Sequence, residues 1–143
     1  MIGYKSDQVV KLAQTIPEDK YAWRPADGAR SVAETFAHLA SANYYFASTL
    51  GAKIPDGVNM ETLEKELKTK DAIISELKRS YQVATDAIKN TTDASLTKKV
   101  EFPFPGEFTQ MTAILIIVTH SNEHLGQLIA YARMNDITPP WSE

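Results

Sequence analysis

Residues 109–135 read TQMTAILIIVTHSNEHLGQLIAYARMN, a long stretch without a single proline. Its most apolar run covers residues 113–118 and is far shorter than the ~20 residues that a membrane-spanning helix needs. The pair Pro139-Pro140 follows the stretch, and proline cannot continue a helix. The segment therefore predicts one long helix over residues 109–135 that buries its apolar face inside the protein.

Three further stretches show helical periodicity of their apolar residues, and they cover residues 4–15, 31–50 and 60–90. We expect the third stretch to open with a short leading turn and to start afresh at Thr69. Four helices in a chain of 143 residues, 43% of them hydrophobic, predict an all-α four-helix bundle that forms one domain over residues 1–143. The inward-facing positions predicted for the first and third stretches are Val9, Leu12, Ala13 and Ile16, and Ile73, Ile74, Leu77, Tyr81, Ala84 and Ile88.

Local signals predict the ends and connections of these helices. Ser31-Val-Ala-Glu34 is a capping-box motif at the start of the second helix, and Gly51 ends that helix. The connections 17–30 and 91–108 are long enough to cross over, so simple up-down-up-down topology is not required. Two prolines in the second of them predict a loop with at most a small hairpin.

Charge and cysteine content exclude several classes of protein. The 15 Lys and Arg residues against 18 Asp and Glu residues give a formal net charge of −3, which does not suit a nucleic-acid-binding surface. The chain has no cysteine, which excludes disulfides, thiolate metal sites and a cysteine nucleophile. The N-terminal residues lack the apolar core of a secretory signal. We therefore expect a soluble, cytoplasmic protein that binds neither nucleic acid nor membranes.

Three histidines, His38, His120 and His124, are the candidate ligands of a metal ion. His120 and His124 are four residues apart on one helix, about 40° around its axis, so both rings can reach one ion. His38, on another helix, can complete a set of three across the bundle. Three protein ligands leave a coordination position open, as in catalytic zinc sites. The alternative is three separate histidines, each satisfied by its own hydrogen bond in the core or at the surface.

The neighbours of these histidines favour the metal site. The face that carries His120 extends through Ile117 and Leu128 toward Tyr131, the side expected to point into the bundle. Gln127 lies about 20° from His120 around the helix axis, so it can line the site or hydrogen-bond to a ligand.

Two glutamates have competing interpretations. Glu34 lies one turn before the histidine of the second helix and can act as a base, but its capping box with Ser31 explains it without any chemistry. Glu123 completes an H-x-x-E-H pattern like that of inverted zinc peptidases, but only 19 residues remain after His124 for the further ligand that such enzymes need. We therefore expect Glu123 to be solvated. The aromatic residues expected in the core or at an interface are Trp23, Tyr44, Tyr45 and Trp141.

Two motifs carry a family resemblance. The first is Trp23-Arg-Pro-Ala-Asp-Gly-Ala-Arg-Ser31 running into Glu34-Thr-Phe-Ala-His38-Leu. The second is Thr119-His-Ser-Asn-Glu-His-Leu-Gly-Gln-Leu128, followed by Tyr131-Ala-Arg-Met and the terminal Pro139-Pro-Trp141. Together they resemble the first-histidine region and the last helix of the DinB-like (DinB/YfiT) superfamily. The resemblance implies a crossed-over four-helix bundle, commonly a homodimer, with a divalent metal held by His38, His120 and His124.

The resemblance also implies a function. Characterised relatives include thiol-dependent S-transferases and isomerases, so we expect a divalent-metal-dependent enzyme of the S-transferase type, with metal-assisted hydrolysis as the closest variant. Because the chain lacks cysteine, a low-molecular-weight thiol must arrive beside the small-molecule substrate. Zinc or nickel is the leading metal, with iron or copper as the other candidates. The alternative is a non-enzymatic dimeric module that binds a metal or a small molecule.

Overall fold

Four long helices make up most of the protein in a computed structural model, which describes residues 1–142. They are α1 (Ile2–Thr15), α2 (Val32–Thr49), α4 (Lys70–Asn90) and α5 (Gln110–Met134). The shorter elements are the 3-10 turns η1 (Glu18–Lys20) and η2 (Asp93–Ser95), the one-turn helix α3 (Leu63–Glu66), and the strands β1 (Lys99–Val100) and β2 (Phe108–Thr109). The predicted all-α class is confirmed.

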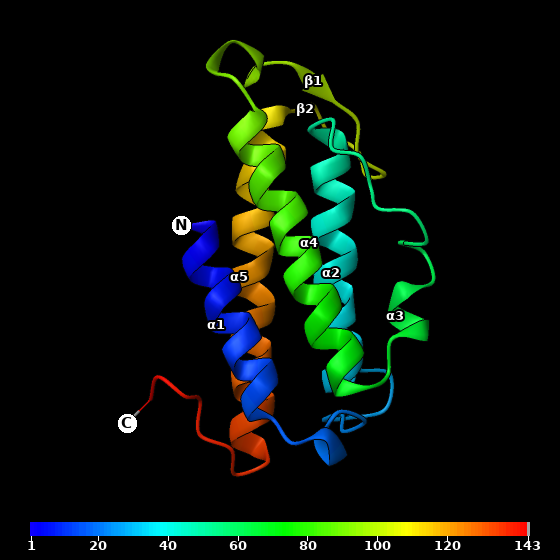
Figure 1. Ribbon diagram of the computed structural model, residues 1–143, viewed down its shortest axis with the longest axis vertical. Coiled ribbons are helices and arrows are strands. Elements are labelled where there is room, and N and C mark those ends of the chain that lie inside the picture. Colours follow the sequence, from blue (N-terminus) through cyan, green and yellow to red (C-terminus); the bar gives the residue numbers. More distant parts are fainter. Residues whose placement is uncertain (143) are drawn as a thin grey trace.

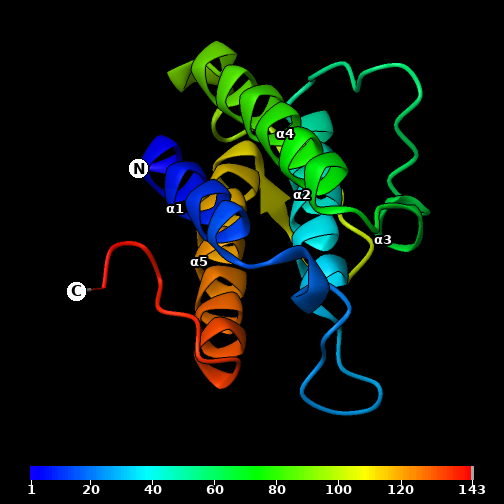
Figure 2. The same ribbon diagram turned by 60° about the horizontal axis from the view of Figure 1, so that its bottom comes forward.

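The four long helices lie side by side, and their connections include a crossover (Figure 1). Both α1 and α2 pack against α4 and α5. The chain runs down α1, up both α2 and α4, and down α5 in this view. Because α2 and α4 run in the same direction, the connection between them, residues 50–69, must return along the bundle, and it swings outside it (Figure 2). A topology other than up-down-up-down is confirmed, but the connection that crosses over is this one and not the two predicted from loop length.

The core lies between the four helices. All four predicted inward positions at α1 are completely buried, and burying each of the larger side chains, Val9, Leu12 and Ile16, contributes about 1.5–3 kcal/mol to folding. Ile74 and Ile88 of α4 are only partly buried, whereas the other predicted positions of that helix are buried. The large side chains that α2 and α5 bury completely or almost completely include Phe36, Leu39, Tyr44, Ile117 and Leu128.

Capping interactions set the start of α2. The Ser31 Oγ accepts a hydrogen bond of 3.1 Å from the Glu34 backbone N–H, and Glu34 Oε2 accepts one of 2.8 Å from the Ser31 N–H. This is the predicted capping box. Gly51 follows the helix with φ +89°, a conformation that favours glycine. Thr69 occupies the N-cap position of α4 as predicted, but its side chain makes no capping hydrogen bond.

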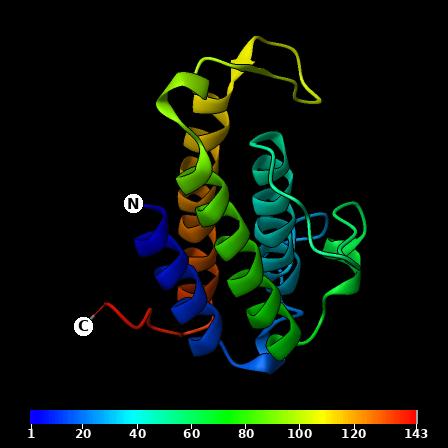
Figure 3. The ribbon, with the colours of Figure 1, turned by 45° about the horizontal axis from the view of Figure 1, so that its top comes forward.

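A small hairpin closes one end of the bundle (Figure 3). Lys99 pairs with Thr109 and Val100 with Phe108 in an antiparallel ladder, which leads directly into α5. The hairpin is as short as the prolines of the 91–108 connection predict. Among residues 1–142, no helix combines the length and the apolar character needed to cross a bilayer.

Candidate metal centre

The three histidines meet where α2 faces α5. His38 projects from α2, and His120 and His124 project from successive turns of α5. The His120 Nε2 atom lies 3.2 Å from His38 Nε2 and 3.1 Å from His124 Nε2. One ring nitrogen from each histidine lies within 4.8 Å of the other two. The fold thus brings together the three side chains that the sequence singles out, although His38 is 82 residues from His120 along the chain.

The spacing of these nitrogens fits a shared transition-metal ion. Two metal–nitrogen bonds of 2.0–2.1 Å that meet at 90–110° place their nitrogens about 2.8–3.4 Å apart. The Nε2 separations of His120 from His38 and His124, 3.2 Å and 3.1 Å, fall within this interval. Imidazole nitrogen is a good ligand for zinc, nickel, iron and copper, so the donor set fits the group that the sequence predicts.

A chain of hydrogen bonds orients His124 from its own helix. Its Nδ1 donates to Gln127 Oε1 at 2.7 Å, and Gln127 Nε2 donates to the Tyr131 hydroxyl at 2.8 Å. The Tyr131 hydroxyl in turn donates to the Arg30 carbonyl at 3.1 Å. The Trp23 ring packs edge-on against Tyr131, with centroids 5.3 Å apart. Because Gln127 accepts from Nδ1, the proton of His124 lies on that atom, and Nε2 keeps its lone pair for a ligand.

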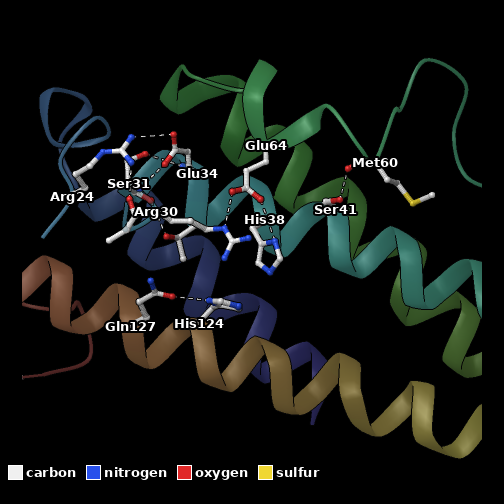
Figure 4. A network of polar contacts seen from close by, with 12 residues as sticks. Arg24, Arg30, Ser31, Glu34, His38, Ser41, Met60, Glu64, His124 and Gln127 are labelled. Atoms are coloured by element: carbon white, nitrogen blue, oxygen red, sulfur yellow. Dashed lines mark hydrogen bonds and ion pairs between the residues drawn. The ribbon is translucent and has the colours of Figure 1, made fainter. Parts of the chain in front are cut away.

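A carboxylate from outside the four helices orients His38 (Figure 4). Glu64 Oε2 of α3 lies 3.3 Å from His38 Nδ1, and its other oxygen accepts a hydrogen bond of 2.6 Å from Arg30 Nε. An ionised carboxylate can only accept, so this contact favours the tautomer of His38 that carries its proton on Nδ1. The lone pair of His38 Nε2 therefore faces His120.

With these tautomers, the cluster has fewer N–H donors than close nitrogen–nitrogen contacts. If His38 and His124 both carry their proton on Nδ1, their Nε2 atoms are acceptors, and His120 Nε2 can donate to only one of them. One close nitrogen–nitrogen contact then remains without a donor. A cation between the rings satisfies all three lone pairs at once, as a single proton cannot.

Burial favours the neutral form of His120 and His38. Desolvation, together with the positive charges that His124, His38 and Arg30 carry, lowers the pKa of His120 to about 4. Desolvation also lowers the pKa of His38, as does Arg30, while Glu64 opposes the shift. Neutral imidazole is the form that binds a metal, so near pH 7 no proton competes at these two rings.

An apolar pocket of about 640 Å³ opens onto one side of the cluster, with His38 and His120 in its wall. His124 is only 8% exposed and does not line it. Tyr45, expected in the core or at an interface, is half-buried and lines this pocket. The other lining residues are Ser41, Ala42, Phe46, Met60, Glu61, Pro103, Phe104 and Ile116.

The two glutamates lie as their simpler interpretations predict. Glu34 is held by the capping box and by an ion pair of 3.1 Å with Arg24, and its hydrogen bond from the Ser31 N–H holds its pKa below the usual value. Glu123 is exposed on α5. Neither belongs to the cluster of nitrogen atoms described above.

Sequence reasoning missed Glu64 and Arg30. Glu64 lies in the connection between two long helices, in a segment without any recognisable motif, and Arg30 ends a loop. Local periodicity cannot place residues whose position depends on the path of a long connection. Gln127, in contrast, lies three residues after His124, and helical spacing alone indicates their contact.

Comparisons with known proteins agree with this fold. The sequence profile of the DinB superfamily matches residues 5–128. An uncharacterised protein of Bacillus subtilis strain 168, YjoA, is 24% identical over 126 residues, which cover 86% of this chain and 79% of YjoA.

Solved structures of other proteins have the same fold. A DinB-like protein from Bacillus cereus ATCC 10987 has a TM-score of 0.82 at 17% identity, covering 99% of this chain and 92% of its own. The structure of Bacillus subtilis YjoA, also DinB-like, has a TM-score of 0.72 at 19% identity, and the match covers 93% of this chain and 87% of YjoA. A conserved protein from Enterococcus faecalis has a TM-score of 0.70 at 12% identity, covering 93% and 91%. On the evidence of its sequence and its fold, this chain belongs to the DinB superfamily.

Proposed function

We propose that this protein is an enzyme that depends on a divalent transition metal, zinc or nickel before iron or copper, held by His38, His120 and His124. The reaction we propose is the transfer of a low-molecular-weight thiol to a small electrophile, with metal-assisted hydrolysis as the closest variant. The observation that carries the proposal is the convergence of three Nε2 atoms, two of them on rings whose Nδ1 faces a protein acceptor.

The residues around the cluster have distinct tasks in this scheme. When bound, a cation held by three neutral imidazoles lowers the pKa of a thiol or water molecule beside it. Gln127 and Glu64 hold the rings of His124 and His38 in position. The pocket beside His38 and His120 binds the substrate and keeps water away from the reacting group.

The absence of cysteine from the chain supports a thiol that comes from outside. A free thiol of this kind stays reduced in the cytoplasm, which is the compartment we propose for the protein. We also propose a homodimer, as the family resemblance implies, and light scattering after gel filtration measures its mass in solution.

Elemental analysis of the untagged protein tests metal binding. We expect close to one equivalent of a transition metal in the wild type, and a large loss in His38→Ala and His124→Ala. Glu123→Gln is the matched control, because Glu123 is exposed and adjacent to His124, and it should keep its metal. A wild type that holds less than about a tenth of an equivalent and takes up none on titration would contradict the proposal.

A panel of thiols tests the reaction. Bacillithiol, mycothiol and glutathione are each offered with model electrophiles to the metal-loaded protein and to the chelated protein. We expect turnover that disappears on chelation and returns with metal. Stoichiometric metal without turnover across the panel would favour the non-enzymatic binding module instead.

A further inference from the structure

The histidine cluster has two sides of opposite character. On one side, Glu64 and Gln127 line a charged pocket of about 560 Å³ together with three cations, Arg24, Arg30 and Lys65. On the other side, His38 and His120 line the apolar pocket of about 640 Å³. Within residues 1–142, no lysine or arginine lines the apolar pocket, so the two sides are suited to different chemical groups.

The few polar groups of the apolar pocket leave little to bind a charged molecule. Its one carboxylate, Glu61, is exposed and disfavours anions. The Ser41 hydroxyl is already engaged, because it donates to the Met60 carbonyl at 2.7 Å. Polar contacts with a ligand therefore fall to His38, His120 and the hydroxyl of Tyr45.

Aromatic rings shape the rest of this pocket. Phe46 contacts Phe102 edge-on at a centroid distance of 5.4 Å, and Phe102 contacts Phe104 at 5.3 Å. Phe104 is 45% exposed although it lies over the pocket, so apolar surface there remains open to solvent. Pockets of 300–1,000 Å³ that are mostly apolar bind molecules of the size of drugs and cofactors.

We propose that this pocket takes a small molecule with an uncharged, apolar and preferably aromatic body, whose polar reactive group points at His38 and His120. That this molecule is the electrophilic substrate rests on the proposed function. Binding of the apolar body does not require a metal, so it can be tested separately.

Two fluorescent probes with the same rings make the test. N-phenyl-1-naphthylamine is uncharged, and 8-anilinonaphthalene-1-sulfonate carries one sulfonate. Both are titrated into the full chain, after chelation and again with one equivalent of Zn²⁺. We expect the neutral probe to bind about tenfold more tightly than the sulfonate to the chelated protein, because a desolvated charge has no partner in the pocket.

Variants locate the bound probe. Ile116→Glu places a charge in the pocket and should weaken the neutral probe at least about tenfold. Leu115→Glu is the matched control, because Leu115 is 56% exposed on the same helix and does not line the pocket, and it should change the affinity less than about twofold. Phe104→Ala removes a ring from a loop, where the packing of the helices does not depend on it, and should also weaken the neutral probe.

The outcomes separate this inference from the proposed function. If the neutral probe binds, and if Ile116→Glu and Phe104→Ala both weaken its binding, the proposed use of the pocket is supported even if the protein holds no metal. A sulfonate that binds the chelated protein as tightly as the neutral probe would overturn the inference, even if metal binding holds. Equal losses in Leu115→Glu and Ile116→Glu, or no loss in Phe104→Ala, would overturn it as well.

Discussion

His124 and His38 are held in position by two different regions of the molecule. His124 is oriented by Gln127, one turn further along the same helix, so both residues move together with α5. His38 is oriented by Glu64 from α3, a helix of four residues in the connection 50–69 that swings outside the bundle. The first support is local and rigid, whereas the second exists only when a long connection docks correctly.

The difference indicates how the cluster assembles. A helix of 25 residues presents His120 and His124 together as soon as it forms, so two of the three proposed ligands are organised by secondary structure. The third ring depends on tertiary contacts, and Arg30 links them, because its guanidinium binds Glu64 while its carbonyl accepts from Tyr131. One residue therefore connects the supports of both histidines.

The largest effect is expected when a ring is removed. His120→Ala removes the histidine that lies between the other two. Because one of three ligands is lost, Zn²⁺ binding should weaken on the order of a hundredfold to a thousandfold. Competition with a chromophoric chelator measures this. An unchanged affinity in a folded His120→Ala variant would contradict a shared ion.

The next effect separates the two supports. Glu64→Ala and Gln127→Ala should each weaken Zn²⁺ binding by about 10-fold to 100-fold, the usual effect of removing a partner that orients a ligand. We expect the larger loss for Glu64→Ala, because it also removes a charge and frees Arg30. Titration calorimetry measures both variants. A larger loss for Gln127→Ala would show that the local support is the more important one.

The pH dependence of the metal-free protein follows from the buried rings. The pKa of His120 is about 4 in the folded protein and 6.5 in the unfolded chain. Between these values the unfolded chain binds a proton that the folded protein does not, so the free energy of unfolding falls as the pH drops from 6.5 to about 4. Urea unfolding at several pH values measures this. His120→Phe should show a weaker dependence, and an identical one would contradict the prediction.

The same shift sharpens the expected loss of metal in acid. If the imidazoles kept their unperturbed pKa of about 6.5, the metal would be released below about pH 6. The pKa values of His38 and His120 are lowered in the metal-free protein, so protons compete less with the metal for these nitrogens. We therefore expect half of the metal to be released at a pH below about 6. Metal content after dialysis at each pH gives the midpoint.

The smallest effect is expected at the start of α2. Ser31→Ala removes the capping hydrogen bond and should lower the free energy of unfolding by about 1 kcal/mol. Zn²⁺ affinity should change little, because His38 lies two turns further along the helix. Ser6→Ala, at a partly buried position of α1 where the hydroxyl donates to the Gly3 carbonyl of the same helix, is the control. A loss of metal binding in Ser31→Ala would show that the helix start controls the position of His38.

Much of this molecule follows from local patterns in the sequence. The burial of Val9, Leu12 and Ala13 and the start of α2 at Ser31 depend on periodicity and capping, which act over a few residues. The pairing of His124 with Gln127 depends on helical spacing. These features need no knowledge of how the helices pack.

The remainder depends on the path of the chain between helices. Periodicity predicts helices, but not that α2 and α4 run in the same direction, because that is decided by how their apolar faces pack. Glu64 reaches His38 only through this path, and Tyr45 faces a pocket because the loop with Phe104 folds over it. Contacts of this kind join residues far apart in sequence, and composition carries no sign of them.

The most direct measurement of the shared ion is X-ray absorption spectroscopy of the Zn²⁺-loaded protein. We expect three imidazole nitrogens at about 2.0–2.1 Å from the ion in the wild type and two in His38→Ala. Two imidazoles in the wild type, unchanged in His38→Ala, would show that α5 binds the ion alone and would contradict a site built across the bundle.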